Sequence, residues 1–406
     1  MNNSDNNLDL NNNLPIRENQ ALVGNEVIRA KNLTVAFKTK DGALPIIRKT
    51  SISIDKKEIV GLVGESGSGK SVLLKTLIGF NDNSEVDADT LNLGGVDLLK
   101  IRKRDWKKIR GTKIAYIPQD PLTSLNPTMR IGNQLKEAIL VTEKKVYKET
   151  VKRLKEQLAN NSIDQQQYKQ ELAQAKANKK YSLSRKGIKA RLNEIFEFIG
   201  IEDVSRRLRA YPNEFSGGMR QRIAIAIAVI SKPDVIIADE PTTALDVTIQ
   251  AKVLDLLKKL RDELGTTIIF ISHNIALVAN FCDYIYVMYA GKIVEQGTTE
   301  EVFTDPKHPY TWALISSLPE EGSDDELLSI PGTPPNMFDL PKGDPFAQRN
   351  EYALKIDFEK EPPMFKVTDT HWAATWLLHK DYKGTAIPKI IANKIAIAKK
   401  SFTKKA

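Results

Sequence analysis

The pattern of apolar and polar positions predicts alternating strands and helices over most of the chain. Short apolar runs, rich in β-branched residues and typical of buried strands, occur at Ile59–Val63, Lys113–Pro118, Val235–Asp239 and Thr266–Ser272. Apolar residues recur at helical spacing in Val72–Ile78, Ile223–Ile230 and Val247–Leu264. This alternation is typical of an α/β protein.

Hairpin signals flank these elements. Alternation from Val27 to Phe37 and the run Ile46–Ile54 predict two strands with a turn at Lys40-Asp41-Gly42. Asp89–Leu93 with the following Gly94-Gly95 predicts another strand and turn. A closing hairpin is expected where Ala290-Gly291 separates two more apolar runs, Tyr284–Tyr289 and Lys292–Gln296.

Residues 136–200 are lysine-rich, low in glycine and patterned as helix, with a break at Asn160–Asp164. We expect a protruding two-helix hairpin at about 143–187, because its apolar stripe is narrow and its other faces are charged. A solvated spacer and an extra contact, to a membrane subunit or an anionic lipid surface, are both open interpretations.

Both ends of the chain differ from the middle. Residues 1–26 are polar and Asn-rich, which predicts a mobile arm. Beyond Pro319 a proline-rich stretch precedes a helix-like pattern over His371–His379. The tail from Lys380 is basic, which fits either a solvated tail or contact with a membrane surface.

Composition narrows the class of protein. With 406 residues, 41% of them hydrophobic, the chain is long enough for two or three domains. No apolar run reaches the roughly 18 residues of a membrane span, and the first residues lack the pattern of a signal peptide. The single cysteine, Cys282, excludes an internal disulfide. We therefore expect a cytoplasmic protein whose net charge of +9 suits either nucleic acid or an anionic membrane face.

The stretch GESGSGKS at 64–71 matches the phosphate-loop pattern G-x-x-x-x-G-K-[ST], and a predicted strand precedes it while a helix follows. Its glycines allow the backbone N–H groups to approach an anion at a helix N-terminus. Lys70 is expected to reach the β- and γ-phosphates and Ser71 to bind Mg²⁺. The candidate nucleotide-binding residues here are Gly64, Glu65, Ser66, Gly67, Ser68, Gly69, Lys70, Ser71 and Val72.

Polar residues at strand ends are candidates for the chemistry. Gln119 follows one predicted strand and is suited to a metal or a water. Asp239 and Glu240 end another, and strand alternation would point them in opposite directions, so that Asp239 could hold Mg²⁺ and Glu240 polarise a water. His273 ends a third strand, where an isolated histidine is more often structural than catalytic.

A second potential anion site begins at Ser216, where a serine N-cap and two glycines, Gly217 and Gly218, open a helix. Phe37 stands at a strand end, where it fits either base stacking or a core position.

Together these motifs resemble the nucleotide-binding subunit of ATP-binding cassette (ABC) transporters over about residues 27–320. Within that family the chain is similar to the D-type ATPase of oligopeptide and dipeptide importers. The narrower resemblance rests on motifs at Gln119-Asp120-Pro121, Pro241–Val247, His308–Thr311 and Ile330–Pro335. Nickel importers share much of this pattern.

The resemblance implies an α/β P-loop NTPase of ABC type, with a RecA-like mixed sheet, an antiparallel β subdomain and an α-helical subdomain. The expected cassette is 27–305, with its helical subdomain at about 120–232, and 306–406 is a C-terminal extension.

Function follows from the same resemblance. It implies ATP hydrolysis that energises oligopeptide import, with Mg²⁺ held by Ser71, Gln119 and Asp239. Glu240 would be the general base, while His273 would contact the γ-phosphate. Gln119 would couple the site to the membrane subunits. Ser216 and Gly218 would serve the nucleotide of a partner cassette. Gly217, Asp246 and Phe37 are further candidate nucleotide-binding residues.

The implied partners are a second ATPase subunit of F-type, two transmembrane permeases and, indirectly, an extracellular solute-binding protein. No nucleic acid is expected, and the implied location is the cytoplasmic face of the membrane.

The chain departs from the family pattern at two places, and two other classes of protein are disfavoured. The signature reads FSGGM where the family commonly reads LSGGQ. Importer ATPases of this type often carry a C-terminal iron–sulfur centre, but the aligned positions here are Asp344, Asn350, Asp357 and Thr375, which supply no thiolate, so no cluster is expected. A soluble ABC ATPase is disfavoured by the single cassette with a short hairpin. A GTP switch would need Asn-Lys-x-Asp, which the chain lacks at its nearest match, Asn393–Ala396.

Overall fold

The computed structural model describes residues 25–40, 42–243, 245–317, 330–382, 384, 391–396 and 399. It divides into two compact units. The first comprises the described residues up to Trp106 and from Thr267 onward, and the second comprises Lys107–Thr266. The expected polar arm, apart from its last two residues, lies outside the described residues, as does most of the basic tail.

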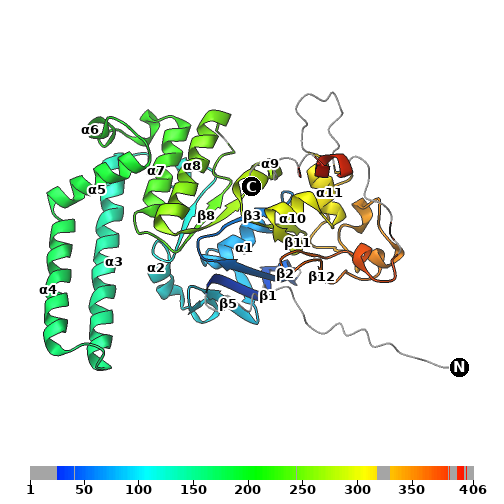
Figure 1. Ribbon diagram of the computed structural model, residues 1–406, viewed down its shortest axis with the longest axis horizontal. Coiled ribbons are helices and arrows are strands. Elements are labelled where there is room, and N and C mark those ends of the chain that lie inside the picture. The colour runs from blue at the N-terminus through cyan, green and yellow to red at the C-terminus, as the bar shows by residue number, and fades with distance from the viewer. Residues whose placement is uncertain are drawn as a thin grey trace. The chain divides into compact units, whose positions relative to one another are not determined.

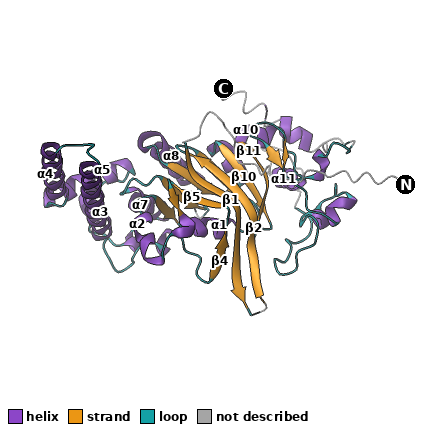
Figure 2. Ribbon diagram, turned by 90° about the horizontal axis from the view of Figure 1, so that it is seen from below, coloured by secondary structure: helices purple, strands orange, loops and turns teal. Residues whose placement is uncertain are grey.

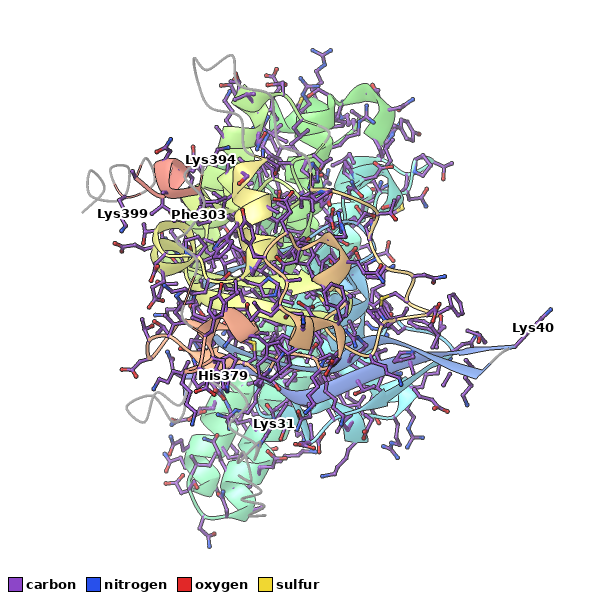
Figure 3. All side chains as sticks on the ribbon, turned by 90° about the vertical axis from the view of Figure 1, so that its right-hand side faces the viewer. Lys31, Lys40, Phe303, His379, Lys394 and Lys399 are labelled. Carbon is purple, nitrogen blue, oxygen red and sulfur yellow. The ribbon has the colours of Figure 1, made fainter. Side chains whose placement is uncertain are left out.

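The antiparallel sheet of the first unit has the order β2-β1-β5-β6, and β4 also pairs with β1. Its strands are β1 (Glu26–Thr39), β2 (Gly42–Asp55), β4 (Ser84–Asp87), β5 (Thr90–Leu93) and β6 (Val96–Asp97). The predicted hairpin is confirmed, with Thr39 opposite Gly42 and Lys40 at its tip (Figure 3). Figure 2 shows how far β1 and β2 extend together. Ile28, Leu33 and Val35 are fully buried, as apolar positions facing a core should be.

A second sheet of this unit is mixed. β3 (Ile59–Val63) lies between β10 (Tyr284–Tyr289) and β9 (Thr267–Ile271) and is parallel to both. β11 (Lys292–Thr298) closes the predicted hairpin with β10. All five residues of β3 are buried, which explains its continuous apolar run. The helix α1 (Lys70–Leu77) follows β3 after the glycine loop, and α9 (Ile275–Phe281) follows β9.

The C-terminal extension packs onto this mixed sheet. It starts after α10 (Thr299–Thr304) with α11 (Pro309–Ser316) and continues mainly in 3-10 turns. β13 (Trp372–Ala373) pairs with β11, and β12 (Phe365–Lys366) pairs with β13. Residues 391–396 are helical, and Ile391 and Ile395 pack in one buried cluster with Trp312.

The prediction of a helix over His371–His379 is wrong. Trp372 and Ala373 form a strand, and only Trp376–Leu378 form a 3-10 turn, capped by the Thr375 side chain. The reason is tertiary: β13 hydrogen-bonds along β11, and the Ala374 N–H donates to the Val294 carbonyl at 2.7 Å. Such pairing overrides a weak local preference for helix.

In the second unit, β7 (Ile114–Ile117) and β8 (Val235–Asp239) are parallel neighbours. The remaining structure is helical: α2 (Trp106–Ile109) at the unit boundary, α3 (Ile131–Ala159), α4 (Gln165–Ser182), α5 (Arg185–Phe198), α6 (Val204–Arg207), α7 (Gly217–Val229) and α8 (Val247–Leu264). The predicted hairpin is confirmed as the antiparallel pair α3 and α4, with the break at 160–164 (Figure 1).

Burial along the hairpin is uneven. The buried residues of α3 are Ile131, Leu135, Ile139 and Leu154, so most of them lie before residue 143. No residue of α4 is buried. Among the described residues, no helix is both long enough and apolar enough to cross a bilayer.

Candidate functional site

The loop between β3 and α1 has a backbone shape that requires glycine. Gly64, Gly67 and Gly69 have φ values of 151°, 80° and 103°, which other residues rarely adopt. At Gly64 an added Cβ would lie 2.2 Å from the Met288 carbonyl oxygen. The loop is therefore a tight turn, and it delivers the chain into the N-terminus of α1, where backbone N–H groups are available to an anion.

Lys70, the first residue of α1, is buried against this loop. Its Nζ donates to the carbonyl oxygens of Gly64 and Glu65, each at 2.8 Å, and lies 3.3 Å from the Ser68 hydroxyl. The ammonium is thus fixed above the turn. Ser66, Gly67 and Ser71 are exposed and Val72 is half-buried. A phosphate-binding cradle fits this arrangement, because a lysine ammonium and a helix N-terminus lie beside a glycine loop that is partly exposed.

His273 belongs to the same edge of the sheet. β3 and β9 are parallel, with Leu62 opposite Ile271, so the phosphate loop and His273 follow the carboxyl ends of adjacent strands. The His273 side chain is exposed. Ligands of open α/β sheets bind outside this edge.

Phe37 lies near the end of β1, opposite Leu44 of β2 and Ser84 of β4. It is half-buried, so either role remains open and base stacking stays a prediction.

The second unit brings Gln119, Asp239 and Glu240 to one strand edge, because β7 and β8 are parallel with Ile117 opposite Ala238. Gln119 Nε2 donates to Glu240 Oε2 at 2.9 Å, and the Thr243 hydroxyl donates to the same oxygen at 3.0 Å. Ala244, in the turn that follows, lies outside the described residues.

Asp239 has a separate partner. It accepts a hydrogen bond from the Tyr116 hydroxyl at 2.7 Å. Burial and this bond to Asp239 raise the pKa of Tyr116. The two carboxylates therefore have different partners, and their separate roles stay a prediction. The cause is only partly strand alternation, since Glu240 already has a left-handed φ of 46°.

Ser216 is the N-cap of α7, and its hydroxyl accepts the Met219 N–H at 3.4 Å. Ser216 and Gly217 are exposed, and a Cβ at Gly217 would meet nothing closer than Leu245 Cδ2 at 3.9 Å. At Gly218 a Cβ would lie 2.2 Å from Ile249 Cγ2 of α8. The two glycines thus differ: Gly217 leaves the helix start open to a ligand, while Gly218 lets α7 approach α8.

Asp246 caps α8, accepting the Ile249 N–H at 2.9 Å. Capping the helix is enough to explain an aspartate at this position, and a role at a nucleotide stays a prediction.

Three residues that the sequence analysis did not connect meet at the phosphate loop. The Glu65 N–H donates to the Tyr310 hydroxyl, and the Glu65 carboxylate binds Arg349. These contacts span 245 and 284 residues of sequence. No local pattern reports such a separation, although Tyr310 stands within the His308–Thr311 motif.

The positions aligned with the iron–sulfur ligands serve as local caps. Each accepts a backbone N–H: Asp344 from Phe346, Asn350 from Tyr352, Asp357 from Leu354 and Thr375 from Leu377. Asp344 and Asp357 are buried. Burial raises the pKa of Asp344 to about 7 and, with less effect, that of Asp357. The absence of a cluster stays a prediction.

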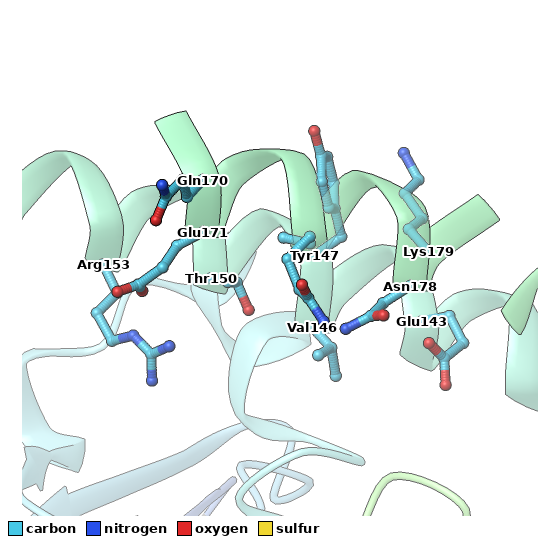
Figure 4. Close-up of a pocket in the computed structure, with 11 residues that line it drawn as sticks. Glu143, Val146, Tyr147, Thr150, Arg153, Gln170, Glu171, Asn178 and Lys179 are labelled. Carbon is cyan, nitrogen blue, oxygen red and sulfur yellow. The ribbon is translucent and has the colours of Figure 1, made fainter. Parts of the chain in front are cut away.

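A groove of about 470 Å³ runs between α3 and α4 (Figure 4). Its lining mixes charges of both signs, among them Arg153, Glu171 and Lys179, and Lys179 Nζ lies 4.2 Å from the centre of the Tyr147 ring. None of the candidate site residues lines it. We assign it no ligand, because its charges are already balanced within the hairpin.

Two family models match this chain. The family model described as "ABC transporter" matches residues 47–243, and the model described as "Oligopeptide/dipeptide transporter, C-terminal region" matches residues 294–356.

Individual proteins match over nearly the full chain. The oligopeptide transport ATP-binding protein OppD of Mycoplasma genitalium is 55% identical, covering 95% of this chain and 96% of its own length. AmiE of Streptococcus pneumoniae, another oligopeptide transport ATP-binding protein, is 46% identical, and the match covers 91% of this chain and 94% of AmiE. The dipeptide transport ATP-binding protein DppD of Lactococcus lactis is 45% identical, and the match covers 87% of this chain and 91% of DppD.

Among solved structures, cbiO1 from Clostridium perfringens, part of the ABC transporter complex cbiONQ, matches with a TM-score of 0.51. The identity is 22%, covering 69% of this chain and 92% of that one. At this identity the match concerns the fold alone, and the predicted fold class is confirmed.

Proposed function

Because this chain belongs to the ABC transporter ATP-binding subunits, we propose that it hydrolyses ATP to energise oligopeptide import through a membrane transporter. The proposal is carried by one observation: a phosphate loop with Lys70 fixed over its turn, in a chain that also matches the peptide-transporter C-terminal region. The alternatives are related importers of dipeptides or nickel, and the dipeptide relative keeps the first of these open.

In the first unit, loop N–H groups and Lys70 would bind the nucleotide phosphates. Glu65, Ser66, Gly67, Ser68, Gly69 and Val72 would shape or line the same cradle. Ser71, on the first turn of α1, has a hydroxyl suited to Mg²⁺. His273 would contact the γ-phosphate, and Phe37 would stack on the base.

In the second unit, Glu240 would accept a proton from the attacking water. Its bond from Gln119 orients the carboxylate and ties the Gln119 loop to the chemistry. Asp239 and Gln119, with Ser71, would hold Mg²⁺, which supplies charge neutralisation to the phosphates when bound. Phosphoryl transfer needs mainly positioning and charge, which this set of residues supplies.

The nucleotide site would be shared between two cassettes. Ser216 and Gly218 would serve the nucleotide on the phosphate loop of a second ATPase subunit, of F-type. Gly217 and Asp246 would also bind nucleotide. The helix start at Ser216 supports this, because Ser216 and Gly217 are exposed and a helix N-terminus favours an anion. The other partners would be two permeases, with a solute-binding protein acting through them, at the cytoplasmic face of the membrane.

The proposed organisation keeps the boundaries set by the sequence. A cassette at 27–305 would carry a helical subdomain at about 120–232, and 306–406 would form the extension. The hairpin at 143–187 would be an insertion without a part in hydrolysis.

Two measurements test the function. Purified Lys70→Ala protein should lose ATP binding by at least about 100-fold, since the phosphates lose their main cation. Unchanged affinity would end the proposal. The second measurement uses this subunit reconstituted in vesicles with the permeases that co-purify with it. With the subunit and ATP both inside the vesicles, labelled oligopeptides should be imported. Uptake of nickel in place of peptides would favour the related importer.

A further inference from the structure

Glu65, the second residue of the phosphate loop, is held at two of its groups by the C-terminal extension. Its backbone N–H donates to the Tyr310 hydroxyl at 2.6 Å. Its carboxylate forms a bidentate pair with Arg349, with Nη1 to Oε2 at 2.6 Å and Nη2 to Oε1 at 2.9 Å. Two parallel charge-assisted bonds fix direction as well as distance. We call Glu65, Tyr310 and Arg349 the Glu65 clamp.

Arg349 is itself fixed before it reaches Glu65. Its side chain is 5% exposed, its Nε donates to the Pro331 carbonyl at 2.7 Å, and Nη1 also donates to the Tyr289 hydroxyl at 3.0 Å. Hydrogen bonds to Glu65 and Tyr289 raise the pKa of Arg349, against the effect of burial. The pair is therefore largely buried, and salt weakens it less than an exposed pair.

Tyr310 is equally constrained. It is fully buried, and its ring lies 4.6 Å from that of Tyr289 and 5.3 Å from that of Phe346, centre to centre. Since Tyr289 belongs to β10, beside β3, the clamp is anchored to the sheet that carries the loop.

The clamp acts on the residue that holds Lys70. The Glu65 carbonyl accepts both Lys70 Nζ at 2.8 Å and the Ser68 N–H at 3.2 Å. A rotation or shift of the Glu65 peptide would therefore move the ammonium and the loop N–H groups together. Such a shift would misalign the donors available to the phosphates, and so weaken nucleotide binding.

We propose that Arg349 is a positioning residue of the nucleotide site, through which the C-terminal extension sets the shape of the phosphate loop. This inference rests on the proposed function, because it concerns the nucleotide that the loop binds. It extends that function by making nucleotide affinity depend on residues outside the cassette.

The test compares Arg349→Gln and Glu65→Gln in the full-length protein, by titration with a fluorescent ATP analogue and by steady-state hydrolysis. Each change should raise the Kd and KM for nucleotide about 10-fold, because a charge-assisted pair in a buried site is lost. kcat at saturating ATP should fall less than about 3-fold, because bound nucleotide restores the loop. The double variant should be no worse than either single variant.

Glu361→Gln is the matched control. Glu361 lies in the extension and pairs with Arg48 of β2 and with Lys292 of β11, without contacting the phosphate loop. Glu361→Gln should lower thermal stability about as much as Arg349→Gln does and leave nucleotide affinity unchanged. If Arg349→Gln does not fold, Arg349→Lys keeps the charge but not the paired donors, and should show an intermediate loss.

Unchanged affinity in the folded variants, or an equal loss in Glu361→Gln, would overturn the clamp. Lys70→Ala measured in parallel separates the two proposals. If only Lys70→Ala loses binding, the clamp fails and the proposed function stands; if Lys70→Ala also binds normally, the proposed function itself fails.

Discussion

At the residue scale, the end of β8 shows how adjacent side chains are given different tasks. Asp239 accepts a hydrogen bond from Tyr116, whereas Glu240 accepts hydrogen bonds from Gln119 and Thr243 on one carboxylate oxygen, Oε2. The left-handed conformation of Glu240 is rare for a residue with a side chain and is typical of functional sites. These contacts distinguish the two carboxylates, and we propose Glu240 as the base and Asp239 as a metal ligand.

Glu240→Gln should therefore lower kcat by at least about 100-fold, because an amide cannot accept the proton from water. ATP affinity should remain within about 3-fold of wild type, since the phosphate loop is untouched. Single-turnover hydrolysis and nucleotide titration on the same preparation measure both quantities. Hydrolysis at the normal rate would remove Glu240 from this role.

A second residue-scale prediction concerns pH. Burial raises the pKa of Asp344 from 3.8 to about 7, so between these values the folded protein binds a proton that the unfolded chain lacks. The contribution of Asp344 to the free energy of unfolding is therefore full below pH 4 and is lost as pH rises toward 7. Asp344→Asn should be more stable than wild type at pH 8 by about 2 to 4 kcal/mol, and equal to it at pH 4.

Urea unfolding at both pH values checks this. Asp369→Asn is the control, because its carboxylate is 96% exposed and should change stability little at either pH. A constant difference between wild type and Asp344→Asn across the range would show that Asp344 is charged when folded.

At the element scale, the contact between α7 and α8 depends on one missing side chain. Gly218→Ala would place a methyl group 2.2 Å from Ile249 Cγ2, so the helices must separate. We expect a loss of about 1 to 3 kcal/mol in the free energy of unfolding.

Gly217→Ala is the matched substitution one residue earlier. Its methyl group meets nothing closer than 3.9 Å, so stability should stay unchanged or rise by up to about 1 kcal/mol through helix propensity. Chemical denaturation of the two variants measures the difference. Equal effects would mean that packing against Ile249 does not decide the identity of residue 218.

At the scale of the whole molecule, the α3–α4 hairpin contributes little to the core. Only Leu154 is buried between residue 143 and the end of α4. Replacing residues 143–182 with a short glycine-serine linker should leave the protein folded, with a change in stability below about 2 kcal/mol and basal ATP hydrolysis retained. Thermal unfolding and hydrolysis assays test this.

The same deletion distinguishes the two interpretations of the hairpin, a solvated spacer and an extra contact. Normal assembly with the membrane subunits would support the spacer interpretation, whereas lost assembly with normal hydrolysis would support an extra contact. Loss of folding would show that the hairpin belongs to the core after all.

The sequence by itself determined the features that depend on local spacing and residue type. The phosphate loop follows from glycines in left-handed conformations before Lys70, and the hairpin from apolar spacing on either side of Asn160–Asp164. The strand-end positions of Gln119, Asp239 and His273 follow from short apolar runs that end in polar residues. Such signals lie within a few residues of one another, so the chain itself carries them.

Only the tertiary structure decided what distant segments do to one another. The His371–His379 segment has a helical pattern but becomes a strand, because β11 offers unpaired backbone groups that a neighbouring strand satisfies. Arg349 reaches Glu65 across 284 residues, and its bidentate pairing depends on a burial that no local pattern encodes. The physical reason is the same in both cases: hydrogen bonds and charges are satisfied by partners that are close in space, and a local sequence pattern does not report which distant segments those are.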